Sequence, residues 1–300
     1  MIKINKILCP VDFCRCSENA LKNALIIAQK YQAELHLFHA ILIYENETYQ
    51  AGENTPDFTK SYDLLSKISD TKLNTMLESK ANDLEIKKII TRGFSASEEI
   101  LTYAGENAFD LIVMGTHGRK GVGHFLMGSV AEKVVRTAQC PVLTIHEQTK
   151  TIDDYEHIFV PVDFSDYSRL ALNYGLELAS MYNADITLFH VVEQNIHPSF
   201  YTAGKSSIFE IDSDLRDRSI EAMKEFREKA GHKDVSTRYV ITEGKVGKEI
   251  IDYLKDHPVD LVVIATHGLT GIEHFLLGSN AEKVVRRATA PVLTVKKIKV

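Results

Sequence analysis

The chain has 300 residues, of which 44% are hydrophobic and 25% are charged, and its formal net charge is −6. The length allows about two domains with a core each, and the negative charge argues against a general binder of nucleic acids or membrane surfaces, because both need a basic face. No apolar run approaches the roughly 20 residues of a membrane span, and the chain starts with a strand-like run instead of a signal peptide, so we expect a cytoplasmic protein.

Strands and helices alternate along the first half of the chain. Short runs rich in Ile, Val and Leu, typical of strands covered on both faces, predict strands at 5–12, 34–42, 86–91, 110–115 and 141–146. Helices are predicted between them, at about 17–31, 59–82, 96–107 and 129–138. Ser17 is the expected N-cap of the first helix, and Ser168 that of its counterpart in the second half.

The second half of the chain repeats the first. The segment ILCPVDF at 7–13 returns as IFVPVDF at 158–164, and 20 of the 32 positions aligned between 114–145 and 264–295 are identical. The offset of about 150 residues is the size of a domain, so the pattern indicates duplication of a whole domain.

The order of the elements predicts the fold class. Alternating strands and helices imply parallel sheets with right-handed crossovers. We therefore expect an α/β fold of two tandem open parallel-sheet domains, 1–148 and 154–300, each with about five strands and helices on both faces. Longer polar segments at 44–58 and 193–210 follow the second strand of each copy, and a lid, a partner contact or disorder remains open for them.

The four cysteines all lie in the first half. Because the second copy has none, a disulfide framework is not expected. Cys14 and Cys16 form a C-x-C that could offer two thiolates to zinc, but no second Cys or His pair with suitable spacing accompanies them. We expect reduced thiols rather than a metal site.

A glycine-rich segment follows the predicted fourth strand. Open parallel sheets bind ligands at the carboxyl ends of strands where the strand order reverses, and Asp12 and Gly115 are expected to face each other there. The segment has the spacing Gly115-x2-Gly118-x9-Gly128-Ser129. Gly115 and Gly118 allow close approach of the backbone to a ligand, or a positive φ.

The end of this segment and its cations suit a phosphate. Gly128 and Ser129 open a helix with free N–H groups, where Ser129 can donate a hydroxyl or act as a cap, and Arg119 and Lys120 could neutralise charge. Turn glycines and a capping serine would give the same pattern, and it is neither a Walker A sequence nor a GxGxxG fingerprint. The spacing alone therefore leaves binding and structure equally open.

The whole chain resembles two universal stress protein domains in tandem. Residues 115–129, with Met114 before them, reproduce the Gly-x2-Gly-x9-Gly-Ser/Thr signature of the ATP-binding members of that family, and Pro10-Val11-Asp12 reproduces its Pro-x-Asp. The resemblance implies Rossmann-like domains of the adenine nucleotide alpha hydrolase type. It also implies that ATP is the ligand, with Mg²⁺ held through the phosphates.

The same resemblance implies the residues of the site. Asp12 would contact the base or ribose, backbone near Ala40 and Ile41 would flank adenine, and the glycine-rich segment would surround the phosphates. The expected cofactor-binding residues of the first copy are Pro10, Val11, Asp12, Ala40, Ile41, Met114, Gly115, His117, Gly118, Arg119, Lys120, Gly128, Ser129 and Val130.

The second copy departs from the signature. Ala265 stands in place of Gly115, and an alanine at positive φ costs about 1 kcal/mol. Residues 269–273 read LTGIE where 119–123 read RKGVG, so two cations are lost and one anion is gained. We expect a weaker second site, with Asp163, Gly268, Gly278 and Ser279 as its candidate residues.

Three functions remain open at this point. A nucleotide-dependent stress or regulatory factor is favoured; a slow ATP hydrolase and a scaffold that binds no nucleotide are the alternatives. His117 and His267 could act as acids or bases, but no nucleophile is evidently paired with either, and structural roles are commoner. The apolar segments 141–145 and 291–295 suggest that the two domains pair through their last strands, with a homodimer also possible.

Overall fold

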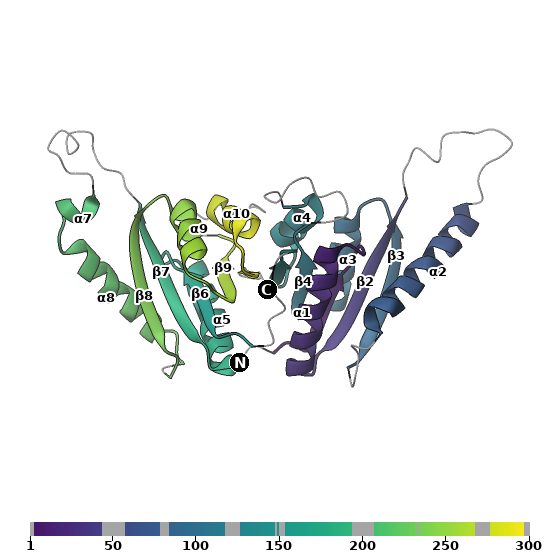
Figure 1. Cartoon of the computed structure of the whole chain (residues 1–300), viewed down its shortest axis with the longest axis horizontal. Helices are drawn as coiled ribbons and strands as arrows, with labels where there is room; N and C mark the ends of the chain where they lie inside the picture. Colours follow the sequence, from purple (N-terminus) through teal and green to yellow (C-terminus); the bar gives the residue numbers. More distant parts are fainter. Residues whose placement is uncertain are drawn as a thin grey trace. The chain divides into compact units, whose positions relative to one another are not determined.

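The protein consists of two compact units of similar size. The computed structural model describes residues 3–43, 58–78, 84–117, 127–147, 149, 154–193, 207–232, 234–267 and 277–296. One unit is Lys3–Asp153, here the first domain, and the other contains Asp154–Val300, here the second domain. Each is an open parallel sheet with helices on both faces, which confirms the predicted fold class (Figure 1).

The first domain contains all the elements predicted for it. Its strands are β1 (Lys6–Pro10), β2 (Glu34–Leu42), β3 (Ile86–Gly93), β4 (Leu111–Gly115) and β5 (Val142–Ile145), in the sheet order β3-β2-β1-β4-β5. Its helices are α1 (Arg15–Tyr31), α2 (Phe58–Leu77), α3 (Ala96–Asn107) and α4 (Ser129–Thr137). The strand pairs are parallel. α3 and α4 contact each other on one face of the sheet, and right-handed crossovers put α1 and α2 on the other.

The second domain repeats this arrangement. Its strands are β6 (His157–Pro161), β7 (Asp185–Glu193), β8 (Thr237–Gly244), β9 (Leu261–Ala265) and β10 (Val292–Val295), in the order β8-β7-β6-β9-β10. Its helices are α5 (Asp166–Tyr182), α7 (Ile208–Ile211), α8 (Leu215–Glu228), α9 (Val246–Asp256) and α10 (Ser279–Arg287). Pairing of the two domains through their last strands stays a prediction, and most of the segments 44–58 and 193–210 lies outside the described residues.

The central strands are buried except for one half-buried residue at an end of each, Lys6 in β1 and Gly115 in β4. Ile7, Leu8 and Cys9 of β1 and Ile112 and Val113 of β4 have no exposed surface. Only the residues that follow such strands can reach a ligand, so the sheet offers its chemistry at the strand ends. Within the described chain, every helix is too short or too polar to span a membrane.

The caps of α1 and α5 differ from the prediction. Cys14 Sγ accepts the Ser17 N–H at 3.4 Å, and Ser165 Oγ accepts the Ser168 N–H at 3.1 Å. The caps are therefore Cys14 and Ser165, not Ser17 and Ser168, because each helix begins two residues earlier than its predicted cap. Ser17 Oγ instead donates to Cys14 O.

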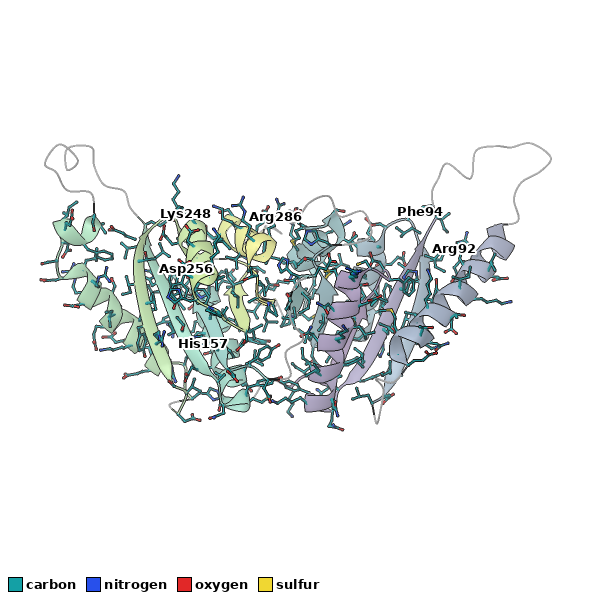
Figure 2. All side chains as sticks on the ribbon, in the orientation of Figure 1. Arg92, Phe94, His157, Lys248, Asp256 and Arg286 are labelled. Atoms are coloured by element: carbon teal, nitrogen blue, oxygen red, sulfur yellow. The ribbon has the colours of Figure 1, made fainter. Side chains whose placement is uncertain are left out.

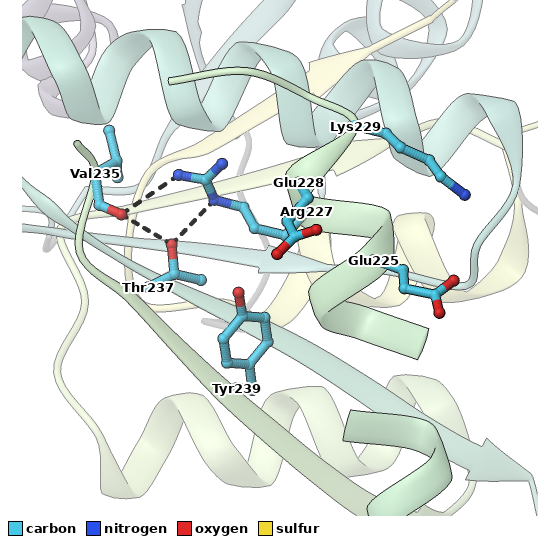
Figure 3. A pocket seen from close by; sticks show the side chains of 7 residues that line it. All are labelled: Glu225, Arg227, Glu228, Lys229, Val235, Thr237 and Tyr239. Atoms are coloured by element: carbon cyan, nitrogen blue, oxygen red, sulfur yellow. Dashed lines mark hydrogen bonds between the residues drawn. The ribbon is translucent and has the colours of Figure 1, made fainter. Parts of the chain in front are cut away.

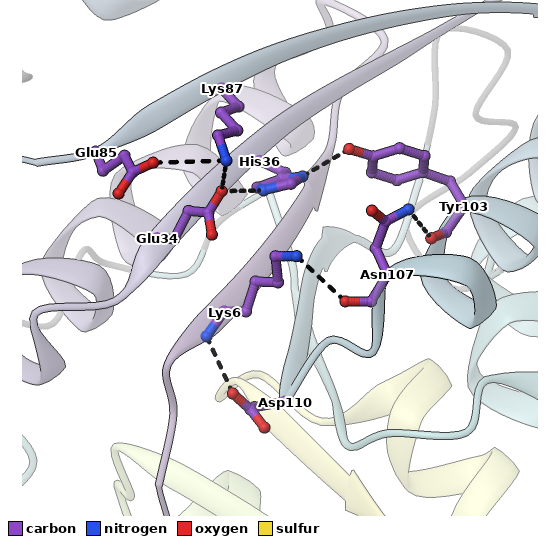
Figure 4. A network of polar contacts seen from close by, with 8 residues as sticks. All are labelled: Lys6, Glu34, His36, Glu85, Lys87, Tyr103, Asn107 and Asp110. Atoms are coloured by element: carbon purple, nitrogen blue, oxygen red, sulfur yellow. Dashed lines mark hydrogen bonds and ion pairs between the residues drawn. The ribbon is translucent and has the colours of Figure 1, made fainter.

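A polar network ties β2 to β3 and α3 in the first domain (Figure 4). The Glu34 carboxylate accepts hydrogen bonds from Lys87 Nζ and from His36 Nε2, the latter at 2.7 Å. His36 Nδ1 lies 2.7 Å from the Tyr103 hydroxyl. The hydrogen bonds from Lys87 and His36 lower the pKa of Glu34 to about 2.

We expect Glu34→Gln to destabilise the first domain by about 1 kcal/mol at neutral pH, since the half-exposed Lys87 is partly screened by water. The pKa of Glu34 is lower in the folded state, so its contribution is present above its ordinary value of 4.5 and is lost as the pH falls through about 2. Urea unfolding followed by circular dichroism should show a smaller difference between variant and wild type at pH 3 than at pH 7. An equal difference at both pH values would contradict this assignment.

Candidate functional site

The carboxyl ends of β1 and β4 lie side by side at the centre of the first sheet. β1 pairs with β4 on one side and with β2 on the other. The chain leaves β1 towards β2 but enters β4 from β3, so the strand order reverses between β1 and β4. Asp12 and Gly115 thus end neighbouring strands, as predicted, at the place where open parallel sheets bind ligands.

Cys14 joins the loops that follow these two strands. Its backbone N–H donates to Asp12 Oδ1 at 3.1 Å, and its thiol lies 3.5 Å from the carbonyl oxygen of His117, to which it donates. As the cap of α1, Cys14 also closes the N-terminus of that helix. The start of α1 therefore holds the site together instead of offering free N–H groups.

The N-cap of α4, by contrast, is Gly128, which has no side chain to cap the helix. Gly128 N–H donates to Thr116 O at 2.7 Å, which places α4 beside the end of β4. Ser129 is the first helical residue, so the prediction that it can cap the helix is wrong. The N–H groups of Ser129, Val130 and Ala131 precede the first intrahelical bond and point out of the helix end, where an anion is favoured.

The acid in the first turn of α4 is neutralised by its own helix. Glu132 pairs with Arg136 at 2.5 Å, and in the second domain Glu282 pairs with Arg286 at 2.9 Å. Figure 2 labels Arg286 on α10. A Glu and an Arg four residues apart on one helix stabilise it modestly. Because each carboxylate has a cation beside it, it offsets less of the positive potential at the helix N-terminus.

Gly115 is required by the packing of α1. A Cβ at this position would lie 2.8 Å from Cys16 Sγ and 3.0 Å from the Cys16 carbonyl carbon. Neither Gly115 nor Ala265 is among the described residues with positive φ, so the predicted conformational penalty at Ala265 is wrong. The second copy has Tyr167 where the first has Cys16, and its strand accommodates the methyl group.

Two histidines share one hydroxyl next to Gly115. Thr116 Oγ1 lies 2.9 Å from His117 Nδ1 and 3.1 Å from His146 Nδ1. The other ring nitrogen of His117, Nε2, is buried and has no hydrogen-bond partner among the residues that the structure describes. Thr116 and His146 were not predicted as site residues, although the Thr-His-Gly triplet at 116–118 recurs at 266–268.

The thiols beside the site stay protonated. Burial raises the pKa of both Cys14 and Cys16, and Cys16 Sγ donates to Ile145 O at 3.1 Å. Within the described ranges, no group of three His, Cys, Asp or Glu side chains is placed to hold a metal ion. The two cysteines therefore act as packing and hydrogen-bonding groups at the start of α1.

The end of β2 lies next to the loop that carries Asp12. His39 Nδ1 is 2.8 Å from Val11 O, and the rings of Phe13 and His39 have their centroids 4.5 Å apart. Phe13 has φ of 66° and its counterpart Phe164 has φ of 64°, a left-handed conformation that costs a bulky residue about 1–3 kcal/mol. Such strain in both copies is a feature that no sequence pattern predicted.

The second domain keeps the same frame. Asp163 Oδ1 accepts the Ser165 N–H at 3.1 Å, and Gly278 N–H donates to Thr266 O at 2.8 Å. A Cβ on Gly278 would lie 3.1 Å from that same carbonyl oxygen. α10 also begins without a side-chain cap, so its N-terminus can accept an anion as well.

A family comparison decides what the duplicated domain is. The model of the universal stress protein family matches residues 3–146 and again residues 154–296. The chain belongs to the universal stress protein family.

Individual relatives agree with this assignment. Universal stress protein MJ0531 of Methanocaldococcus jannaschii is 33% identical over 145 residues, which are 48% of this chain and 84% of that protein. Universal stress protein YxiE of Bacillus subtilis is 27% identical over 147 residues, 47% of this chain and 99% of that protein. A universal stress protein structure from Archaeoglobus fulgidus has a TM-score of 0.70 at 20% identity and covers 98% of this chain and 99% of its own, which shows a shared fold.

The predicted site residues of this universal stress protein differ in exposure. Pro10, Val11, Ile41 and Met114 are buried, so only their backbone could reach a ligand. The half-buried ones are Asp12, Ala40, Gly115, His117, Gly128, Val130, Asp163 and Gly278, and Ser129 and Ser279 are exposed. Gly118, Arg119, Lys120 and Gly268 lie outside the described residues.

Proposed function

We propose that this universal stress protein binds ATP and acts as a nucleotide-dependent stress or regulatory factor, with the first domain as the stronger site. The observation that carries the proposal is the N-terminus of α4, which no side chain of its N-cap residue Gly128 closes and which starts beside the adjacent ends of β1 and β4. Three outward N–H groups and the positive end of the helix dipole suit a phosphate chain.

The remaining groups fit the other parts of the nucleotide. The Asp12 carboxylate is half-buried at the end of β1 and could accept a hydrogen bond from the base or ribose. The backbone of Ala40, at the end of β2, could flank adenine. Mg²⁺ would be held through the phosphates, because no metal cluster is found among the described side chains.

The expected difference in ATP affinity between the two sites rests on charge. Gly115 and Ala265 differ in helix packing rather than in φ, so this difference says nothing about the nucleotide. Arg119 and Lys120 remain as the cations that the second copy replaces with Leu269 and Thr270. Extra positive charge favours a triphosphate in the first domain.

The serines at the starts of α4 and α10 allow a matched test. We expect Ser129→Glu to weaken ATP binding at least tenfold, because its carboxylate repels phosphate at the same N–H groups. The exposed residue tolerates the change, since an acid in the first turn stabilises a helix. Ser279→Glu is the control in the second domain, and calorimetric titration with ATP and Mg²⁺ on the full chain measures both.

Each outcome of this titration has a clear meaning. A stoichiometry near one that is lost in Ser129→Glu and kept in Ser279→Glu supports the proposal. Loss only in Ser279→Glu would reverse the order of the two sites. No binding at millimolar ATP would reject ATP as the ligand and favour the scaffold. A slow hydrolase would release phosphate under the same conditions, and Ser129→Glu would abolish that release.

A further inference from the structure

A single hydroxyl connects two imidazoles at the end of β4. Thr116 is fully buried, and its Oγ1 lies 2.9 Å from His117 Nδ1, 3.1 Å from His146 Nδ1, 3.4 Å from Ile145 O and 3.9 Å from Cys16 Sγ. A hydroxyl carries one proton, so Thr116 can donate to only one of these four atoms at a time. The proton on one imidazole therefore restricts where the other imidazole carries its own.

The second observation is the buried His117 Nε2. It has no hydrogen-bond partner within the described part of the chain, and a buried polar atom without a partner calls for an explanation. The carbonyl of His117 accepts from Cys14 Sγ and that of Thr116 accepts from Gly128 N–H, so the backbone of residues 116–117 lies beside the start of α4, where the phosphate site is proposed. An oxygen of a bound ligand could supply the partner that Nε2 lacks.

We propose that His146, acting through Thr116, sets the tautomer that His117 presents to an anionic oxygen of the nucleotide, an inference that rests on the proposed function. When His146 is protonated, its Nδ1–H donates to Thr116 Oγ1 and can accept nothing in return. Thr116 then donates to His117 Nδ1 at 2.9 Å rather than to Ile145 O at 3.4 Å. Neutral His117 carries its proton on Nε2, which becomes a donor to phosphate.

The opposite arrangement requires neutral His146 with a bare Nδ1. Thr116 can then donate to His146 Nδ1, and His117 donates from its own Nδ1 to Thr116. His117 Nε2 is left as a bare acceptor, which repels a phosphate oxygen. His146 is thus a positioning residue: the first site favours an anion more as the pH falls through the range where histidines titrate, about 6 to 7.

Other groups around the pair do not account for such a response. The titratable or charged side chains on the elements that surround it include Asp12, Cys14, Arg15, Cys16, Glu18, His39, Glu132, Lys133, Arg136 and Glu147. The thiols have raised pKa values, and Glu132 is paired with Arg136. His39 Nδ1 lies 2.8 Å from Val11 O, and His39 is unchanged in the variants below.

The second domain contains only half of this arrangement. Thr266 Oγ1 lies 3.0 Å from His267 Nδ1, as in the first domain. The position aligned with His146 is Lys296. Among the residues that the structure describes, no second imidazole lies against Thr266 Oγ1, so we expect the coupling in the first site alone.

The test compares ATP affinity at pH 8 and pH 6 in a Ser279→Glu background, which silences the second site. His146→Phe removes the competing acceptor and leaves Thr116 to donate to His117 at any pH. We therefore expect His146→Phe to bind ATP about threefold more tightly than its parent at pH 8 and equally at pH 6. A merely structural His146 would give the variant no gain. Equal or weaker binding by the variant at pH 8 would overturn the proposal.

A second measurement needs no nucleotide. Long-range ¹H–¹⁵N correlation spectra of the histidine rings report which nitrogen carries the proton. In the wild type, the Nε2–H form of His117 should increase as His146 is protonated, and Thr116→Val should abolish this link. If the tautomer of His117 does not change when His146 is protonated, the coupling is rejected. If the tautomer changes but the protein does not bind ATP, the proposed function is rejected instead.

Discussion

Gly115→Ala should destabilise the first domain by about 1–3 kcal/mol, because overpacking a close helix–strand contact forces the backbone to shift. The new Cβ would meet Cys16 Sγ at 2.8 Å, which a side-chain rotation could relieve. It would also meet the Cys16 carbonyl carbon at 3.0 Å, which only movement of α1 could relieve. Cys16→Ala in the Gly115→Ala background should therefore restore only part of the lost stability.

Hydrogen exchange read separately on α1 and α5 measures this effect in the full chain. Faster exchange is expected in α1 of Gly115→Ala, with α5 unchanged. The matched control is Ala265→Gly, which removes a buried methyl group and should cost about 1 kcal/mol, through lost packing and added chain entropy. Wild-type protection of α1 in Gly115→Ala would show that the strand and helix are not in tight contact.

Arg227→Met should destabilise the second domain by about 2–4 kcal/mol. Arg227 is only 5% exposed at the end of α8, and its guanidinium donates to the Val235 carbonyl and to Thr237 Oγ1 (Figure 3). It also donates to the carbonyls of Gly231 and His232. Met fills the volume but leaves these acceptors without their donor. The carbonyl of the buried Val235 left alone costs about 1–3 kcal/mol, whereas Gly231 and His232 are exposed, so water can replace part of their lost hydrogen bonds. Gly231 and His232 both have positive φ, so the same side chain holds a strained turn.

Urea unfolding followed by circular dichroism measures this loss. Lys229→Met is the control, because Lys229 lines the same hollow but is exposed, and its replacement should stay within about 0.5 kcal/mol of the wild type. Arg227→Lys should keep less than half of the stability that Arg227→Met loses, since one ammonium group cannot reproduce the several hydrogen bonds of the planar, forked guanidinium. Full recovery with Lys would mean that charge alone, not the fork, supports the turn.

The fold could be predicted from the sequence because its signals are local. The apolar runs at 7–9 and 111–114 are continuous, so they identify buried parallel strands without further information. Caps were less predictable: Cys14 serves as the cap of α1 although Ser, Thr, Asp and Asn are the usual caps. A sulfur that caps a helix leaves no distinctive pattern.

The sequence predicted which strand ends carry the candidate site, but not the contacts between its residues. The switch between β1 and β4 follows from the strand order, and it placed Asp12 and Gly115 correctly. The reason for Gly115, contact with Cys16, joins residues 99 positions apart. The hydroxyl of Thr116 reaches His146 across 30 positions. No periodicity connects such pairs, so only the folded chain brings them together.

The contact between Gly115 and Cys16 also makes exchange between the two repeats directional. Gene conversion that copied only the codons around Ala265 into the first repeat would bring a methyl group against Cys16 and weaken that domain. The reverse event would place a glycine in the second repeat, where it removes atoms and creates no clash. Under selection for stability, gene conversion that copies this segment from the first repeat into the second should therefore be retained more often than conversion in the opposite direction.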